Sequence, residues 1–146
     1  MVLMDIVESL LTAIYNLLTA DDTLKSRMGG SVRLYPVWAV PDAVFPYLVH
    51  RLDIRPLADY SPQSKSTYLL DIWSHSPSMK ETLDIRERLM ELLDGLDSST
   101  DETSEFWLWK QGDGFVPETS ENIYHYACQF SLKHINDSQI GQLLKR

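Results

Sequence analysis

Basic residues are scarce in this 146-residue sequence, which has 13 Lys and Arg against 21 Asp and Glu and a formal net charge of −8. Affinity for nucleic acid depends on Lys and Arg that displace the counterions condensed on the phosphate backbone. The densest basic stretch, residues 80–88, alternates its basic residues with acidic ones, which is typical of a solvated helix face. The composition therefore argues against sequence-specific nucleic-acid binding.

Cysteine and long apolar runs are scarce as well. Cys128 is the only cysteine, so one chain has neither an intramolecular disulfide nor a four-cysteine zinc site. The N-terminal stretch MVLMDIVESLLTAIYNLL contains Asp5 and Glu8 and lacks a basic start, unlike a secretory signal. No apolar run is long enough to cross a bilayer. We expect no membrane partner and a reducing, cytosolic compartment.

Signatures of catalysis are also missing. The sequence has no G-x-S-x-G nucleophile elbow, no H-E-x-x-H zinc motif and no P-loop. Cys128 lies at an apolar position of a predicted strand, which favours a buried structural thiol over a nucleophile. The four histidines, His50, His75, His125 and His134, have no metal-ligand spacing and are interpreted as strand-surface or strand-end imidazoles. We predict no catalytic residue, no cofactor and no metal.

Two main helices are predicted from the spacing of apolar residues. Leucine, isoleucine and valine recur every three or four residues from Leu3 to Leu18, which indicates an amphipathic helix. Residues 22–28 predict a further helical turn that ends at Gly29-Gly30. Ser76-Pro77 is a helix-start signal, and the second main helix is expected to run from there to about Leu93, with Gly95 as a left-handed stop.

The remaining segments are interpreted as strands and loops. Strands are predicted at residues 47–54, 66–75, 105–111 and 122–135, with a short β-leaning segment at residues 31–35. Residues 36–46 form a proline-rich loop, residues 56–66 a projecting loop, the stretch DSSTDETS a polar connection and Gly112-Asp113-Gly114 a turn. This order predicts one α+β domain over residues 1–146. Its two layers are an antiparallel or mixed sheet of four to five strands and two main helices packed on one face.

Alternation along the strands assigns faces to the large side chains. Tyr68, Leu70 and Ile72 share one face, which leaves Trp73 on the opposite face, where something must cover it, such as a neighbouring subunit. Alternation also places Trp107 and Trp109 together on one face, opposite Phe106 and Leu108. Because large aromatics are enriched at protein contacts, the two indoles indicate an interface; packing under a loop is the alternative.

The acidic stretch from Glu91 to Glu105 contains no Lys or Arg. It is either a solvated helix end and loop or part of an interface. The candidate protein-interface residues are therefore Tyr60, Trp73, Asp101, Glu102, Trp107 and Trp109.

One run of motifs resembles a known family. The N-terminal helix, the turn through Gly30 to VRLY, a loop of prolines, FPYLV at residues 45–49 and TYLLDIWSHSPSMKETLDIRERLMELLDGL at residues 67–96 occur in this order. Together they resemble the tail-completion, or tail-terminator, proteins of long-tailed double-stranded-DNA bacteriophages. The resemblance covers residues 3–135 and leaves residues 136–146 as a C-terminal extension. Its motifs are structural and not catalytic.

The resemblance implies a function. Such proteins form a ring, commonly hexameric, that caps the tail tube and meets the head-tail connector protein, while DNA passes through the ring. It implies as partners other copies of the chain, the tail-tube protein and the connector, and as locations the host cytoplasm during assembly and then the virion neck. The loops at residues 36–46 and 56–66 are natural contacts. The alternatives are another neck, connector or baseplate assembly subunit and, less favoured, a small hydrolase that would need a concave polar pocket.

Overall fold

The computed structural model describes residues 6–54, 63–75, 77–99, 104–120 and 122–136. A six-stranded sheet has the order β1-β2-β3-β6-β5-β4. Its strands are β1 (Leu34–Pro36), β2 (Tyr47–Asp53), β3 (Gln63–Ser74), β4 (Asp97–Ser99), β5 (Ser104–Val116) and β6 (Tyr124–Asn136). The helices are α1 (Ile6–Thr19), α2 (Asp22–Arg27) and α3 (Lys80–Leu93). The predicted α+β class is confirmed, but the prediction of four to five strands is wrong.

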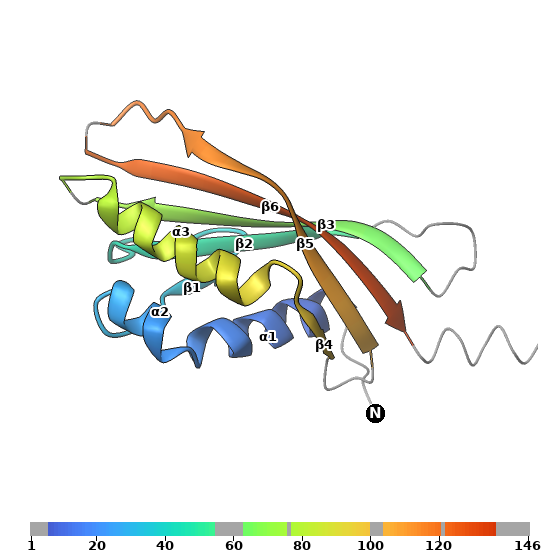
Figure 1. Cartoon of the computed structure of the whole chain (residues 1–146). Coiled ribbons are helices and arrows are strands. Elements are labelled where there is room, and N and C mark those ends of the chain that lie inside the picture. Colours follow the sequence, from blue (N-terminus) through green and yellow to red (C-terminus); the bar gives the residue numbers. More distant parts are fainter. Residues whose placement is uncertain (1–5, 55–62, 76, 100–103, 121, 137–146) are drawn as a thin grey trace, which may run out of the picture.

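The strands pair antiparallel, except that β1 lies parallel to β2. Figure 1 shows α1, α2 and α3 together on one face of the curled sheet. The opposite face, which we call the open face, carries none of these helices. No helix among the described residues combines the length and apolarity needed to span a bilayer.

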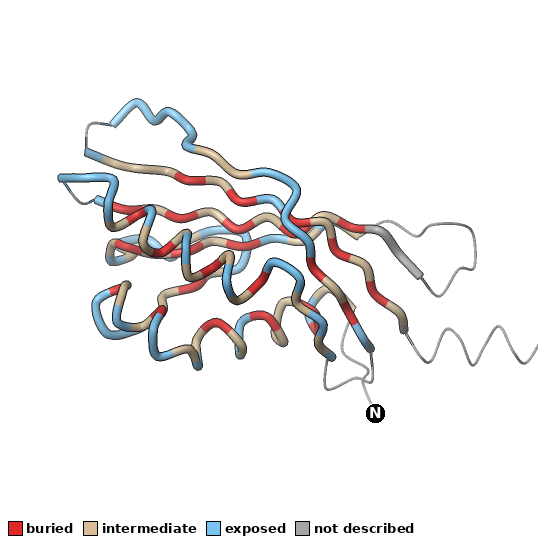
Figure 2. The backbone as a smooth tube through the Cα atoms, in the orientation of Figure 1, coloured by how far each residue is buried: buried red, intermediate tan, exposed pale blue. Residues whose placement is uncertain are grey.

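Figure 2 shows buried positions along the helices and the central strands, and these residues form one hydrophobic core. Tyr68, Leu70 and Ile72 of β3 are each 0% exposed, as the alternation predicts. The same face of β6 buries Cys128, Phe130 and Leu132, and the helices contribute buried leucine and isoleucine side chains. One apolar cluster thus joins all three helices to the central strands.

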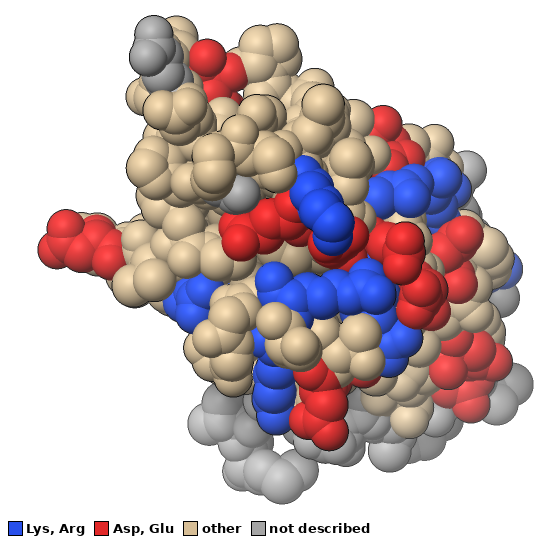
Figure 3. Space-filling model, turned by 60° about the vertical axis from the view of Figure 1, so that its left-hand side comes forward, with Lys and Arg blue, Asp and Glu red and all other residues tan. Residues whose placement is uncertain are grey.

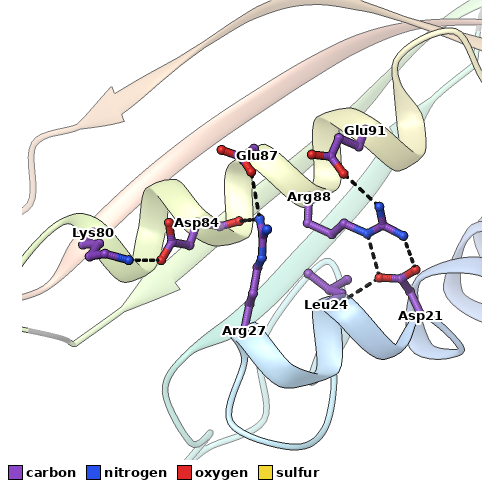
Figure 4. A network of polar contacts seen from close by, with 8 residues as sticks. All are labelled: Asp21, Leu24, Arg27, Lys80, Asp84, Glu87, Arg88 and Glu91. Carbon is purple, nitrogen blue, oxygen red and sulfur yellow. Dashed lines mark hydrogen bonds and ion pairs between the residues drawn. The ribbon is translucent and has the colours of Figure 1, made fainter.

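Polar contacts join α2 to α3 (Figure 4). Asp21 caps α2 by accepting a hydrogen bond from the Leu24 N–H at 2.8 Å, and Arg88 donates to the same carboxylate from Nε at 2.9 Å and Nη2 at 2.6 Å. The Arg88 hydrogen bond is the main reason why the pKa of Asp21 lies below 3.8. Arg27 donates to the carbonyl oxygen of Asp84 at 2.6 Å. The charged side of α3, interpreted from sequence as a solvated face, is therefore partly the contact with α2.

Helix α3 begins at Lys80 and not at Ser76-Pro77 as predicted. β3 remains paired with β6 as far as Ser74, so the chain needs the following residues to pass from the sheet to the helix layer. The N-cap residue is Met79, which makes no side-chain cap hydrogen bond. The predicted stop at Gly95 is confirmed by its φ of 80°, in the left-handed region that glycine tolerates.

The prediction of a turn at residues 112–114 is wrong, because β5 continues through them to Val116. The pairing with β6 shifts between Lys110 and Gly112, so Gln111 is the extra residue of a β-bulge. The bulge places Asp113 opposite Cys128, on the helix side of the sheet. The predicted polar connection also contains a strand, since β4 pairs with residues 105–107 of β5.

Candidate interaction surfaces

Asp113 is the centre of a polar cluster that joins α3 to β5 and β6. Arg86 of α3 donates from Nε to Asp113 Oδ2 at 2.7 Å, and the Tyr126 hydroxyl donates to the same oxygen. Burial would raise the pKa of Asp113, but the hydrogen bonds from Arg86 and Tyr126 outweigh it and lower the pKa below 3.8. Burial and the hydrogen bond to Asp113 raise the pKa of Tyr126 to about 12. The Asp113 carboxylate therefore stays ionised, as its ion pair with Arg86 requires.

Aromatic rings cross the open face in register. Tyr47, Trp73 and His125 are direct neighbours on β2, β3 and β6. The Trp73 ring stacks on His125 with ring centroids 3.9 Å apart and on Tyr47 with centroids 6.3 Å apart. Rings of the same chain therefore cover part of Trp73, which is half-buried, and its place in a subunit interface stays a prediction.

His125 is held by two carboxylates. Its Nδ1 lies 2.8 Å from Glu118 Oε1 and its Nε2 lies 3.5 Å from Asp71 Oδ1. Burial would lower the pKa of His125, but the two carboxylates outweigh burial and raise the pKa above 6.5. The charged imidazole is thereby favoured against the face of Trp73, as in a cation–π contact. Glu118 and His125 also line a depression of about 270 Å³, together with Met79, Phe115 and Tyr124.

Two other histidines lie inside the protein, which corrects their interpretation as strand-surface or strand-end imidazoles. His50 and His134 are 2% and 3% exposed. Burial lowers the pKa of His50 to about 4, and its Nδ1 lies 2.7 Å from the Tyr68 hydroxyl. Burial also lowers the pKa of His134. Within the described residue ranges, no group of three His, Cys, Asp or Glu side chains could hold a metal ion.

Cys128 is 0% exposed, as predicted, and burial raises the pKa of its thiol to about 12. Only a thiolate attacks disulfide and maleimide reagents. We predict that an aromatic disulfide reagent fails to modify the folded chain at neutral pH and modifies one thiol per chain after unfolding in urea. Absorbance of the released thiolate measures both reactions, and rapid modification without urea would contradict the predicted protection.

Trp107 and Trp109 lie on the open face, opposite Phe106 and Leu108, which are 1% and 0% exposed. The assignment of faces in this strand is therefore confirmed. Trp107 is half-buried, whereas Trp109 remains 46% exposed. The other three candidate interface residues, Tyr60, Asp101 and Glu102, lie outside the described residues, as does most of the loop at residues 56–66; its last four residues belong to β3.

The loop between β1 and β2 exposes apolar side chains. Trp38 is 80% exposed and Val44 62%, while Val37 and Val40 are each 52% exposed. Val37 has a φ of 66°, and the Trp38 N–H donates to the Pro36 carbonyl at 2.7 Å, which makes a strained γ-turn. Arg33 donates from Nε to the carbonyl oxygens of Val44 and Pro46 at 2.9 Å and 3.0 Å. The chain thus holds Trp38 outward on a constrained loop.

A shallow apolar groove lies between α1 and the β1 edge of the sheet. Its volume is about 500 Å³, and it is lined by Val7, Glu8, Leu11, Thr12, Tyr15, Pro36 and His50. Glu8 is the only charged residue among the 14 residues of α1, whereas the equally long α3 has seven. Half of a surface helix is normally polar. Five of the 14 residues of α1 are nonetheless polar, so the helix is poor in charge but not wholly apolar.

Charges of both signs are mixed on the face in Figure 3, where basic side chains lie beside acidic ones. Oppositely charged side chains of α3 form ion pairs, such as Lys80 with Asp84 at 2.7 Å and Arg88 with Glu91 at 2.8 Å. This face does not present the single-sign basic patch that a phosphate backbone would attract.

No known protein-family model and no curated protein matches the chain. Its fold is similar to that of a chain from a solved structure described as "Virion of native gene transfer agent (GTA) particle". The TM-score is 0.72 at 14% sequence identity, and the likeness covers 88% of this chain and 96% of that chain. At this identity the comparison shows a shared fold that extends over nearly the whole of both chains.

Proposed function

We propose that this chain is a structural virion protein that forms a ring, caps the tail tube and joins the tail to the head connector. The observation that carries the proposal is the likeness in fold to a chain from the virion of a gene transfer agent particle over 88% of the sequence. The order of the FPYLV and TYLLDIWSH segments, typical of tail-terminator proteins, supports the finer role.

The surface supports an assembly role. Ten large hydrophobic side chains of the described residues are exposed, including Trp38 and Trp109. Four of them, Val37, Trp38, Val40 and Val44, lie in the one loop between β1 and β2, and apolar side chains gathered in this way favour a protein contact. The net charge of −8 suits a ring through which DNA passes, because like charge discourages adhesion to the conduit.

Electron microscopy of the purified protein with tail tubes from the same genome tests the proposal. We expect rings of one diameter, seen alone or bound at one end of each tube. Light scattering on the same sample gives the number of subunits. A chain that stays monomeric at millimolar concentration and leaves tube ends bare would refute the ring role. Binding to the portal end of capsids without binding to tubes would instead identify a connector subunit.

A further inference from the structure

The two ring nitrogens of His125 face carboxylates from two other parts of the chain. Glu118, two residues beyond the end of β5, places Oε1 2.8 Å from Nδ1. Asp71 of β3 places Oδ1 3.5 Å from Nε2, and this nitrogen is buried without a hydrogen-bond partner among the described residues. At that length the contact with Asp71 is ionic and too long for a strong hydrogen bond. The His125 side chain is only 12% exposed, so the surrounding protein largely determines which form of the ring is favoured.

This placement suits the charged ring and not the neutral one. A neutral imidazole has one N–H, and its other nitrogen carries a lone pair. Between Asp71 and Glu118, either tautomer would point that lone pair at a carboxylate oxygen. The imidazolium has an N–H on both nitrogens and can direct one toward each carboxylate. The geometry therefore favours a ring that keeps its proton.

Stacking adds a third contact that depends on the charge of the ring. The Trp73 ring of β3 lies 3.9 Å from the His125 ring, centroid to centroid, with 13° between the two planes. The face of an indole attracts a cation. The charged ring therefore joins β6 to β3 through Trp73 and Asp71, and to the chain after β5 through Glu118.

The other groups around His125 add no competing charge. Val116 of β5 and Trp73 of β3 lie opposite it in the two neighbouring strands. Tyr47 of β2 lies beyond Trp73, and burial raises the pKa of its hydroxyl, so this ring stays neutral at physiological pH. His75, two residues beyond Trp73, packs on Phe45 with ring centroids 5.4 Å apart. Among the described residues, Asp71 and Glu118 are thus the charged partners of His125.

We propose that His125, Asp71, Trp73 and Glu118 form a proton-dependent clasp that holds β3 and the chain after β5 against the start of β6. Loss of the proton turns one of the two carboxylate contacts from attraction to repulsion and loosens this end of the sheet. Glu118 and His125 also line the depression of about 270 Å³, so its wall changes with the state of the clasp. The clasp lies within one chain and does not depend on the proposed ring.

The stabilisation by the clasp has a defined direction with pH. Burial would lower the pKa of His125, but Asp71 and Glu118 outweigh it and hold the folded-state pKa above 6.5. A raised folded-state pKa gives stability that is complete below the unfolded value of 6.5 and is lost as the pH rises through the folded value. The clasp is therefore closed in mildly acidic solution and opens in alkaline solution.

NMR titration of the imidazole signals tests which groups hold the proton, with the His125 signal assigned by its loss in His125→Gln. We expect a wild-type midpoint above pH 6.5. Glu118→Gln and Asp71→Asn should each lower the proton affinity of His125 about tenfold, because each removes one negative neighbour. Asp53→Asn is the matched control, since it removes an exposed carboxylate six residues along β2 from Tyr47. It should change the affinity less than about twofold.

Hydrogen exchange tests whether the proton also holds the chain in place. After correction for the intrinsic rate, protection of the backbone at residues 115–118 should fall about tenfold in the wild type as the pH rises through the midpoint. Glu118→Gln should show weak protection at both pH values, and Asp53→Asn should behave like the wild type. A midpoint at or below 6.5, a midpoint insensitive to both carboxylate substitutions, or protection in Glu118→Gln that follows the wild type would overturn the clasp. Each of these outcomes would leave the ring proposal intact.

Discussion

Replacing Asp113 by alanine is expected to lower the free energy of unfolding by about 2–3 kcal/mol, near the lower end for breaking a buried ion pair. The Asp113 side chain is only 10% exposed, whereas Arg86 is 28% exposed and can partly recover hydration, which reduces the loss. The substitution also leaves the Tyr126 hydroxyl without its acceptor. Urea denaturation measured by tryptophan fluorescence gives the difference.

The dependence of this stability difference on pH tests whether the charge of Asp113 causes it. The pKa of Asp113 is lower in the folded chain than its ordinary value of 3.8, so its stabilisation is complete above that value. It is lost as the pH falls through the folded-state pKa, so wild type and variant should converge in acid. Lys80→Ala is the control, because its exposed pair with Asp84 should contribute less than about 0.5 kcal/mol. If Asp113→Ala lost no more unfolding free energy than Lys80→Ala, the ion pair between Arg86 and Asp113 would not be an important source of stability.

Trp73→Ala is expected to destabilise the isolated chain by about 2–3 kcal/mol, because it removes a large half-buried ring and two ring contacts. The effect should already be present in monomeric protein, since Tyr47 and His125 belong to the same chain. Thermal unfolding at low protein concentration measures it without a contribution from assembly.

Trp109→Ala is the matched comparison, because this indole is 46% exposed and lies on the open face without a ring contact among the described residues. It should change the stability of the monomer by less than about 0.5 kcal/mol and weaken ring formation instead. If Trp73→Ala left monomer stability unchanged and abolished rings, Trp73 would be a subunit contact, as the sequence pattern alone predicts.

Periodicity predicted the elements whose apolar spacing is regular. α1, β2, β3 and β6 follow from this spacing, and the predicted faces of β3 and β5 are correct, because burial on one side imposes alternation. β4 was not predicted, since its three residues Asp97–Ser99 are polar and their pairing depends on β5. A strand of this kind is specified by its neighbour and not by its own composition.

The two glycines of β5 are compatible with two structures that the local sequence does not distinguish. A Gly-Asp-Gly segment is compatible with a turn or with a bulged strand, and the bulge at Gln111 is decided by pairing with β6. The contact between Arg86 and Asp113 joins residues 27 positions apart and could not be found from local spacing. By contrast, the shortage of charge in α1 and the tryptophan between two prolines at residues 36–41 are visible in the sequence.

The two outermost strands of the sheet, β1 and β4, have three residues each. Short outer strands offer few unpaired amide and carbonyl groups, and the bulge in β5 distorts the remaining free edge. A further polypeptide cannot readily extend such a sheet by main-chain hydrogen bonding, which is the route to amyloid-like fibres. In the proposed ring, recognition between copies would then depend on side chains, whose shape limits growth.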